Sequence, residues 1–429
     1  MAKGEADQKP KGEREREGEG ECKTEAEAVR YRYPEGGARA WLVVMGCFCV
    51  MFYTFGYLNA FGVYETYYQR DLLKEYTPST IAWIGSLQVF FQFAAGIIAG
   101  PVTDIWGPRV IIWPFSIIYV SAVMLTSICT KYWHFILAQG VLGGLANGLA
   151  YAPAIAVIGQ YFHQRRPLAM GIASAGSSLG GVIFPLMLDR LIYHTHLGFG
   201  WAVRVVGFLV LGLCLTACAT VVPRVPPRKG RYFLLHAFKE PVYSIQVLGM
   251  FFAWWGIFTP FFFLPSYAEA QGLSLDMSIY TLAILNSGSL VGRLLSGFAA
   301  AHLGRFNLVV MGNCVCGILV FCWLRVVSTA AICVFAVLYG IFSGFVVALF
   351  PTTIAEVCAH PTEIGSYVGM ALGLYGIAGL TGTPITGAMI ARYKGYDEAT
   401  IFSGSVLIAG ASLIFVARCL FARRHGWRV

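Results

Sequence analysis

The chain has 429 residues, of which 57% are hydrophobic and only 12% are charged, and its mean hydropathy is +0.66. These values exclude a soluble globular protein and indicate an all-α membrane protein with many spans. The net charge is +9, but the positive residues are scattered in short clusters between apolar runs, a pattern typical of membrane topology and not of nucleic-acid binding.

The first 33 residues are rich in Gly, Glu, Lys and Arg, so they cannot bury enough apolar surface to fold and predict a disordered tail. They lack the short apolar region of a cleavable signal peptide, and the first apolar run is therefore expected to direct insertion. The 12 cysteines lie mostly inside apolar runs. We expect them to be small buried side chains, because no loop pair has a disulfide or zinc spacing.

Twelve apolar runs follow the tail, each long enough to cross a hydrocarbon core of about 30 Å. Their centres are expected near Met51, Phe91, Tyr119, Gly148, Ser178, Leu211, Trp255, Asn286, Cys316, Ile341, Gly376 and Leu407. An even number of spans puts both termini on one side. The loops and C-terminal tip on that side carry 12 Lys or Arg residues against 8 on the other, which predicts that both termini are cytoplasmic.

The strongest break in composition within the body of the chain is the Pro- and Arg-rich stretch 223–241, which divides the spans six and six. The predicted organisation is a cytoplasmic tail (1–33), an N-terminal half (34–222), this cytoplasmic linker, a C-terminal half (242–422) and a basic cytoplasmic tip (423–429).

The two halves also show internal similarity. The stretch GPVTDIWGPR from Gly100 recurs as GFAAAHLGR from Gly297, and Pro185 recurs as Pro384, at offsets of 197 and 199 residues. Agreement between such offsets indicates a duplication, so we expect two related six-helix units.

The stretch from Gly100 to Arg109 lies in the loop after the second span, where its glycines allow a tight turn and where Asp104 and Arg109 can pair or cap helix ends. It resembles the signature loop of the major facilitator superfamily. The resemblance implies a twelve-helix bundle of two six-helix pseudo-repeats, and it implies a gating role for Asp104 and Arg109.

Three further stretches are similar to the monocarboxylate-transporter-like family, in its fungal-type members: Glu35–Trp41 before the first span, Tyr161–Gly180 around the fifth, and Gly382–Gly387 near the eleventh. Within the second of them, Arg165 and Arg166 are expected to anchor the cytoplasmic end of the fifth span and to act in gating. Its regularly spaced glycines offer a smooth face for another helix.

Arg293 lies near the middle of the apolar run Ser278–Ala300. A guanidinium at that depth costs roughly 2.5–3.5 kcal/mol on insertion scales, so it should face a watery or protein-lined cavity. Asn286 and Ser289 lie seven and four residues before it and can share its helix face.

In well-studied animal members of the resembled family, an intramembrane Lys in the first span and an Asp one turn before the Arg couple transport to protons. Here Asn59 and Ser289 occupy those positions. The resemblance therefore implies a substrate-binding role for Arg293, Asn59, Asn286 and Ser289 but not proton symport. A purely structural Arg293, satisfied by backbone carbonyls, is the alternative.

Other polar and aromatic residues in the spans are candidates to line the cavity or to stack on a ring-bearing substrate, although each alone is more often a packing residue. They are Gln88, Gln92, Asn147, Tyr53, Tyr57, Trp254 and Trp255. Glu356, near the end of the tenth span, is interpreted as a latch or cap.

The sequence gives no support for an enzyme. Gly176, Ser178 and Gly180 match G-x-S-x-G, but they lie inside a predicted membrane helix instead of a strand–turn–helix. The histidines form no metal cluster and there is no P-loop, so no catalytic residue, metal or cofactor is expected.

We therefore expect a secondary or facilitative transporter of a small organic solute, such as a monocarboxylate or another anionic or polar metabolite, working by alternating access. A riboflavin-like or secondary-metabolite permease or exporter is the alternative, and a transporter-like membrane sensor is the alternative from another class. The expected partners are the solute and the lipid bilayer, with an accessory membrane protein left open. The expected location is the plasma membrane or, alternatively, a vacuolar membrane.

Overall fold

The structure is a computed structural model that describes residues 33–225, 232–358 and 360–425. Within these residues it contains helices and no strands, and twelve helical segments are long and apolar enough to span a membrane. This confirms the predicted all-α fold and the number of spans. The predicted disordered tail lies outside the described residues apart from Tyr33.

The first six spans make up the N-terminal half. Their elements are α2 (Ala38–Met51), η1 (Phe52–Gly56), α3 (Phe61–Tyr67), η2 (Tyr68–Leu72), α4 (Pro78–Ala94), α5 (Gly96–Trp106), α6 (Arg109–Thr126), α7 (Tyr132–Phe135), η3 (Ile136–Gly143), α8 (Gly144–Tyr161), α9 (Arg166–Tyr193) and α10 (Gly198–Thr220). Of these, η1, η2 and η3 are π-helical segments inside the first and fourth spans, which the sequence pattern did not predict.

The last six spans make up the C-terminal half, preceded by the short 3₁₀ helix η4 (Leu235–Lys239). Their elements are α11 (Pro241–Ile257), α12 (Thr259–Ala270), α13 (Leu275–Leu303), α14 (Arg305–Trp323), α15 (Thr329–Val357), η5 (Pro361–Glu363), α16 (Ile364–Tyr393) and α17 (Asp397–His425). The last helix thus continues three residues into the stretch interpreted as a separate basic tip.

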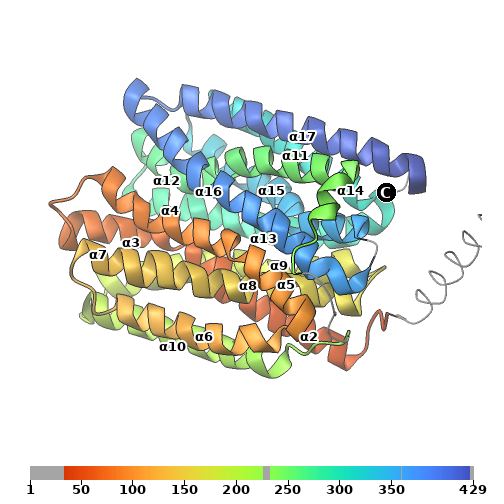
Figure 1. Ribbon diagram of the computed structural model, residues 1–429. Coiled ribbons are helices and arrows are strands. Elements are labelled where there is room, and N and C mark those ends of the chain that lie inside the picture. The colour runs from red at the N-terminus through yellow and green to blue at the C-terminus, as the bar shows by residue number, and fades with distance from the viewer. Residues whose placement is uncertain (1–32, 226–231, 359, 426–429) are drawn as a thin grey trace, which may run out of the picture.

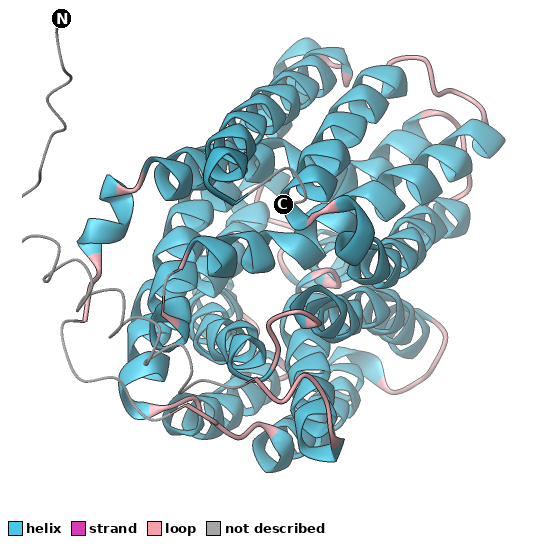
Figure 2. Ribbon diagram, turned by 90° about the vertical axis from the view of Figure 1, so that its right-hand side faces the viewer, coloured by secondary structure: helices cyan, strands magenta, loops and turns pink. Residues whose placement is uncertain are grey.

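The two halves lie side by side. Figure 1 shows the first half, coloured red to yellow-green, beneath the second, coloured green to blue, with the helices running roughly parallel. Figure 2 looks along the helices from the end at which the chain terminates. At this end α5 finishes and α16 begins, and we call it the Asp104 end. The charge distribution predicts that it faces the cytoplasm.

Equivalent turns at the Asp104 end support the duplication. The helices before them, α5 and α13, both stop at a glycine with positive φ, Gly107 at 86° and Gly304 at 84°. A side chain rarely adopts this conformation, so glycine fits both positions. The two residues are 197 positions apart, which is the offset found in the sequence.

The halves join mainly where α9 packs on α13 and where α4 and α5 pack on α16, with smaller contacts of α9 with α15 and of α8 with α16. The backbones approach closely at glycines. A Cβ on Gly100 would lie 2.1 Å from the Gly365 carbonyl oxygen, and one on Gly171 would lie 2.5 Å from the Arg293 carbonyl oxygen. Small residues allow such contacts between membrane helices. The Asp104 end is therefore closed by direct packing of one half on the other.

Candidate functional site

Arg293 lies near the middle of α13 and is buried, with 2% of its surface exposed. Its Nε donates to the Ser289 hydroxyl one turn earlier, at 3.2 Å. Its Nη1 reaches α9 of the other half and donates to the Ser174 carbonyl oxygen at 2.6 Å and to the Ser177 hydroxyl. Charge-assisted hydrogen bonds of this kind offset the cost of burying a guanidinium. Arg293 therefore ties the two halves together in this conformation.

Asn59 and Asn286 meet beside Gly181 of α9. A Cβ on Gly181 would lie 2.7 Å from Asn286 Oδ1 and 3.2 Å from Asn59 Nδ2. Asn59 belongs to the first span and Asn286 to α13, so amides from both halves share the space that this glycine leaves free. The structure brings these two predicted binding residues together, and it pairs the other two, Ser289 and Arg293, through a hydrogen bond.

A cluster of buried aromatic rings crosses between the halves. Phe93 of α4 packs against Trp254 of α11, with ring centroids 4.9 Å apart. The Trp254 ring also stacks on Tyr375 of α16, with a centroid distance of 6.0 Å, and meets the Phe350 ring of α15 edge-on at 5.5 Å. Such pairs are each worth about 0.5–1.5 kcal/mol beyond the area that they bury. The cluster therefore offers flat apolar surface from both halves at one place.

Three buried amides lie on helices of the N-terminal half, two of them on α4, the helix that carries Phe93. Gln88 and Gln92 come from α4, the latter directly before Phe93, and Asn147 comes from α8. Asn147 Nδ2 donates to Gln92 Oε1 and to the Thr54 carbonyl oxygen, each at 3.3 Å. These contacts hold the three helices of the first, second and fourth spans around one polar position.

Five polar atoms in this region lack a hydrogen-bond partner within the described part of the chain: Gln88 Oε1, Gln92 Nε2, Asn147 Oδ1, Trp254 Nε1 and Tyr375 Oη. A buried polar atom without a partner costs about 1–3 kcal/mol. A bound molecule with matching donors and acceptors would remove that cost. We call Gln88, Gln92, Phe93, Asn147, Trp254, Phe350 and Tyr375 the central site.

The other aromatic candidates lie elsewhere. Tyr53 and Tyr57 are buried inside the N-terminal half, where Tyr53 packs tilted and Tyr57 packs edge-on against Tyr119 of α6. Trp255 donates from Nε1 to the Thr381 hydroxyl at 2.9 Å, within the C-terminal half. Of the four predicted stacking residues, Trp254 is thus the one in the central site.

Asp104 connects the halves at the end named after it. Its carboxylate accepts hydrogen bonds from the backbone N–H of Gly365 at 3.1 Å, the N–H of Ser366 at 2.7 Å and the Ser366 hydroxyl at 2.7 Å. These donors belong to the first turn of α16, whose N–H groups have no partner inside the helix. A carboxylate there also interacts favourably with the helix dipole. Asp104 therefore caps a helix of the opposite half.

The predicted gating residues Arg109 and Arg166 act within the N-terminal half. Arg109 Nε donates to the Val221 carbonyl oxygen at 3.5 Å and so connects the start of α6 with the end of α10. Arg166 is buried, and it donates to the carbonyl oxygens of Phe162 at 3.0 Å and Gly159 at 3.4 Å. It thus satisfies carbonyl groups at the end of α8.

Glu35, just before the first span, caps the loop between α8 and α9. Its carboxylate accepts from three consecutive N–H groups, those of His163 at 2.7 Å, Gln164 at 2.8 Å and Arg165 at 2.9 Å. Partial burial acts to raise the pKa of Glu35, but the three donors outweigh it and leave this pKa below the ordinary value. The carboxylate is therefore charged at physiological pH.

Arg305, the first residue of α14, extends this contact to the C-terminal half. Its Nη2 donates to the His163 carbonyl oxygen at 2.8 Å, and Nη1 forms an ion pair with Glu356 at the end of α15. This ion pair lies within the C-terminal half, so the latch role of Glu356 stays a prediction. Glu35 and Arg305 thus contact the same loop segment from its N–H and its carbonyl side. For their place at the predicted gate, we refer to Glu35, Asp104, Arg305 and Glu356 as the gate residues.

Sequence reasoning gave no role to Glu35, Ser174, Ser177 or Arg305. Ser174 and Ser177 are three residues apart on α9 and therefore share a face, which was a usable signal. Arg305 follows the second copy of the signature turn, whereas Glu35 formed part of a recognised stretch without an assigned partner.

The G-x-S-x-G residues serve packing. A Cβ on Gly176 would lie 2.2 Å from the Phe48 carbonyl oxygen, and one on Gly180 would lie 2.5 Å from that of Phe52. They thus form the contact surface of α9 with the first span. Among the described residues, no group of three His, Cys, Asp or Glu side chains is placed to hold a metal ion.

Comparisons with known proteins agree with this architecture. The family model described as Major Facilitator Superfamily matches residues 43–371. The chain is 46% identical over 388 residues to the aspyridones efflux protein apdF of Emericella nidulans, covering 90% of this chain and 79% of that protein. It is 37% identical to the fujikurins efflux protein of Gibberella fujikuroi, covering 91% and 85%.

Among solved structures, the human organic anion transporter MFSD10 (TETRAN) matches with a TM-score of 0.69 and 13% identity, over 88% of this chain and all of that one. This likeness concerns the fold. The narrower resemblance to the monocarboxylate-transporter-like family stays a prediction.

Proposed function

Because this chain belongs to the Major Facilitator Superfamily and is an integral membrane transporter, we propose that it exports a ring-bearing, hydrogen-bonding secondary metabolite by alternating access. The observation that carries this proposal is the central site. There, aromatic faces from both halves come together, and the amides on α4 and α8 retain atoms without a partner within the described residues, namely Gln88 Oε1, Gln92 Nε2 and Asn147 Oδ1.

The chemistry of the central site favours a planar solute with carbonyl, enol or amide groups. Trp254 and Phe93 offer ring faces, while Gln92 and Asn147 offer a free donor and a free acceptor on α4 and α8. Ligand sites combine mostly apolar walls with a few placed polar groups in this way. The efflux proteins named above support the direction of transport, because their names give efflux of aspyridones and of fujikurins.

Alternating access gives the gate residues their part in this proposal. Glycine packing and the bonds of Asp104 and Arg305 close the Asp104 end in this conformation. An exporter must open this end to take up its solute from the cytoplasm and close it before release. We expect opening to break these bonds in one concerted movement, because they all join the same two halves.

A metabolite screen in cells with and without the protein would identify the solute, and uptake into inside-out vesicles would measure its transport. Trp254→Ala should reduce this uptake by tenfold or more, because it removes the ring shared by both halves. Trp255→Ala is the matched control and should retain most of it. Equal losses in the two variants would contradict the assignment of the central site.

A monocarboxylate substrate is the second candidate, favoured by the buried charge of Arg293. Its guanidinium already bonds Ser174, Ser177 and Ser289 in this conformation. A carboxylate would have to replace these bonds after the halves separate. Saturable uptake of a small monocarboxylate, with none of ring-bearing metabolites, would favour this candidate.

Coupling and location complete the proposal. Asn59 and Ser289 cannot titrate, so we expect flux to depend weakly on an imposed proton gradient. Concentrative transport that collapses with a protonophore would contradict this. We also expect a plasma-membrane protein with both termini in the cytoplasm. A protease should then reach the tail and the 223–241 loop from the cytoplasmic side alone.

A further inference from the structure

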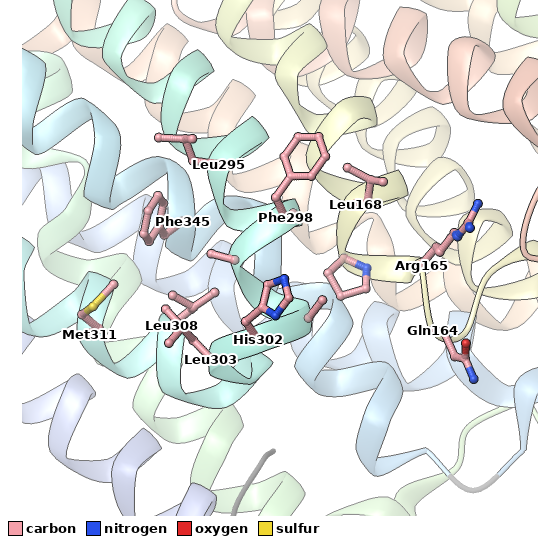
Figure 3. A pocket seen from close by; sticks show the side chains of 14 residues that line it. Gln164, Arg165, Leu168, Leu295, Phe298, His302, Leu303, Leu308, Met311 and Phe345 are labelled. Atoms are coloured by element: carbon pink, nitrogen blue, oxygen red, sulfur yellow. The ribbon is translucent and has the colours of Figure 1, made fainter.

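A groove of about 640 Å³ lies at the Asp104 end, where the start of α9 meets α13, α14 and α15. It draws residues from both halves. Leu168 comes from α9, whereas Leu295, Phe298 and Leu303 come from α13 and Phe345 comes from α15. Figure 3 shows these apolar side chains around one hollow. It is separate from the central site and shares no residue with it.

The floor of the groove is the contact between the two halves. A Cβ on Gly297 would lie 2.9 Å from the Cα of Leu168 and 3.1 Å from the carbonyl oxygen of Pro167. The helices touch there without intervening side chains. The groove in this form therefore depends on the closed arrangement of α9 and α13.

The wall of the groove is apolar and exposed. Phe298 is 62% exposed, Leu303 55% and Leu295 49%, and all three belong to a membrane-spanning helix. Exposed apolar side chains in a span lie against lipid chains. A hollow among them offers an acyl chain more contact than a smooth helix face does.

One edge of the groove is polar and cationic. Arg165, Gln164 and His302 line it, and all three side chains are exposed. Within the described residues, the Arg165 guanidinium has no hydrogen-bond or ion-pair partner. Figure 3 shows His302 between the apolar side chains and the pair Gln164 and Arg165.

The nearby charges leave Arg165 available. The Glu35 carboxylate is engaged by three backbone N–H groups, and Arg305 is paired with Glu356. Arg165 thus remains as an exposed cation at the end of the spans, beside an apolar hollow. A diacyl anion of the adjoining leaflet complements both features, and anionic lipids gather in the cytoplasmic leaflet.

We propose that the groove binds one anionic phospholipid of the cytoplasmic leaflet, with an acyl chain along Phe298 and Leu295 and the phosphate at Arg165, His302 and Gln164. Because both halves form the groove, the lipid stabilises the conformation in which the Asp104 end is closed. Anionic lipid should therefore shift the conformational equilibrium as well as bind. The lipid acts by differential affinity for this state.

The test is native mass spectrometry of the purified full chain with added phosphatidylserine or phosphatidylcholine. The wild type should retain one phosphatidylserine in preference to phosphatidylcholine. Arg165→Gln should weaken this retention about fivefold, since one cation near a membrane surface contributes about that factor. Lys239→Gln, which removes another exposed cation from the predicted cytoplasmic side, is the matched control and should retain it fully.

A second variant tests the hollow itself. Ala301→Trp places a ring in the groove without changing charge and should displace phosphatidylserine while thermal unfolding shows a folded protein. Cys358 follows α15, two residues after Glu356, and is half-buried, so opening of the Asp104 end should expose it. Peptide-resolved labelling of Cys358 with an impermeant thiol reagent should also fall when phosphatidylserine is added to the wild type. This fall should be absent in the Trp variant.

Three results would overturn the proposal. Equal retention of the two lipids would mean ordinary annular lipid. Displacement of phosphatidylserine by its soluble headgroup, glycerophosphoserine, would mean a site for free anions. Undiminished retention in both Arg165→Gln and Ala301→Trp would place the lipid elsewhere.

Discussion

The two halves meet both at the gate residues and in the central site. The two regions differ in whether their buried polar groups have hydrogen-bond partners. At the Asp104 end, the carboxylates of Asp104 and Glu35 each accept three hydrogen bonds. In the central site, Gln92 Nε2, Asn147 Oδ1 and Trp254 Nε1 have no partner within the described residues.

This difference separates two kinds of polar network. A satisfied network stabilises one arrangement of helices. The bonds of Asp104 to α16 and of Arg305 to the His163 carbonyl oxygen are lost when the halves separate, and the Glu35 cap holds the segment that Arg305 contacts. An unsatisfied network lowers stability unless a ligand completes it. We therefore interpret the first region as the device that holds the closed state and the second as the place where solute binds.

The largest expected effect comes from disturbing the packing of the gate. Gly100→Val would place a side chain where a Cβ lies 2.1 Å from the Gly365 carbonyl oxygen. Overpacking costs typically about 1–3 kcal/mol, so the closed state should lose about fivefold to somewhat more than a hundredfold in population. Labelling of Cys358 with an impermeant thiol reagent should rise accordingly, and transport should be lost.

Gly62→Val is the control for this prediction. Gly62 is exposed in α3, and an added Cβ there meets nothing within 4 Å. It should leave both labelling and transport unchanged. A Gly100→Val protein that stays closed would show that α5 and α16 can repack.

Arg293 tests whether a residue can belong to both regions. Lys keeps the charge but loses the planar fork. If Arg293 binds the solute, Arg293→Lys should reach the membrane in near-normal amounts and lose tenfold to a hundredfold in affinity, since a charge-assisted bond contributes about 1.5–3 kcal/mol.

If Arg293 serves only as a tie to Ser174 and Ser177, the same change should reduce folded protein and leave the apparent affinity of the surviving molecules intact. Surface abundance and initial uptake on one preparation distinguish the two outcomes. Arg392→Lys, at the end of α16, is the control for a conservative exchange.

Most of the fold could be predicted from the sequence, because twelve long apolar runs have few alternatives in a membrane. The repeat offset also predicted the paired turns at Gly107 and Gly304. The contacts between the two halves were harder to predict. Arg293 and Ser289 share a helix and could be paired by spacing, whereas Ser174 comes from another half, and nothing local in the sequence indicates it.

In the candidate site too, single residues could be recognised from the sequence, whereas their partners in the other half could not. Asp104 was recognised by its motif, but its acceptance of N–H groups from α16 depends on how the halves pack. Tyr53 and Trp254 look alike as aromatic residues in apolar runs. Only the rotation of each helix decides that Trp254 faces the other half and that Tyr53 faces α6.

A smaller effect is expected from the Glu35 cap. Glu35→Gln removes the charge while keeping the shape, and losing a cap typically costs about 1 kcal/mol. Because the cap lies within the N-terminal half and acts on the gate only through the His163 carbonyl oxygen that Arg305 contacts, the closed state should lose at most about fivefold in population, measured again by Cys358 labelling. Glu75→Gln, at an exposed acid of the loop after the first span, should change nothing. An unaltered Glu35→Gln protein would remove Glu35 from the gate.

The smallest effect concerns pH. Burial lowers the pKa of His163 from its ordinary value of 6.5, and the neighbouring Arg166 and Arg305 lower it further. The folded protein therefore binds fewer protons here than the unfolded chain, so the stability contribution is present above about pH 6.5 and declines as the pH falls below it. The lowered pKa of Glu35 acts in the same direction, but only below about pH 4.5. Between pH 7.5 and 5.5 the change in stability at this contact thus belongs to His163.

Thermal unfolding should occur at a lower temperature at pH 5.5 than at pH 7.5, and His163→Gln should reduce this difference in unfolding temperature. If the variant shows the wild-type difference in full, another group carries the pH dependence and the contact between Arg305 and the His163 carbonyl oxygen is insensitive to the imidazole.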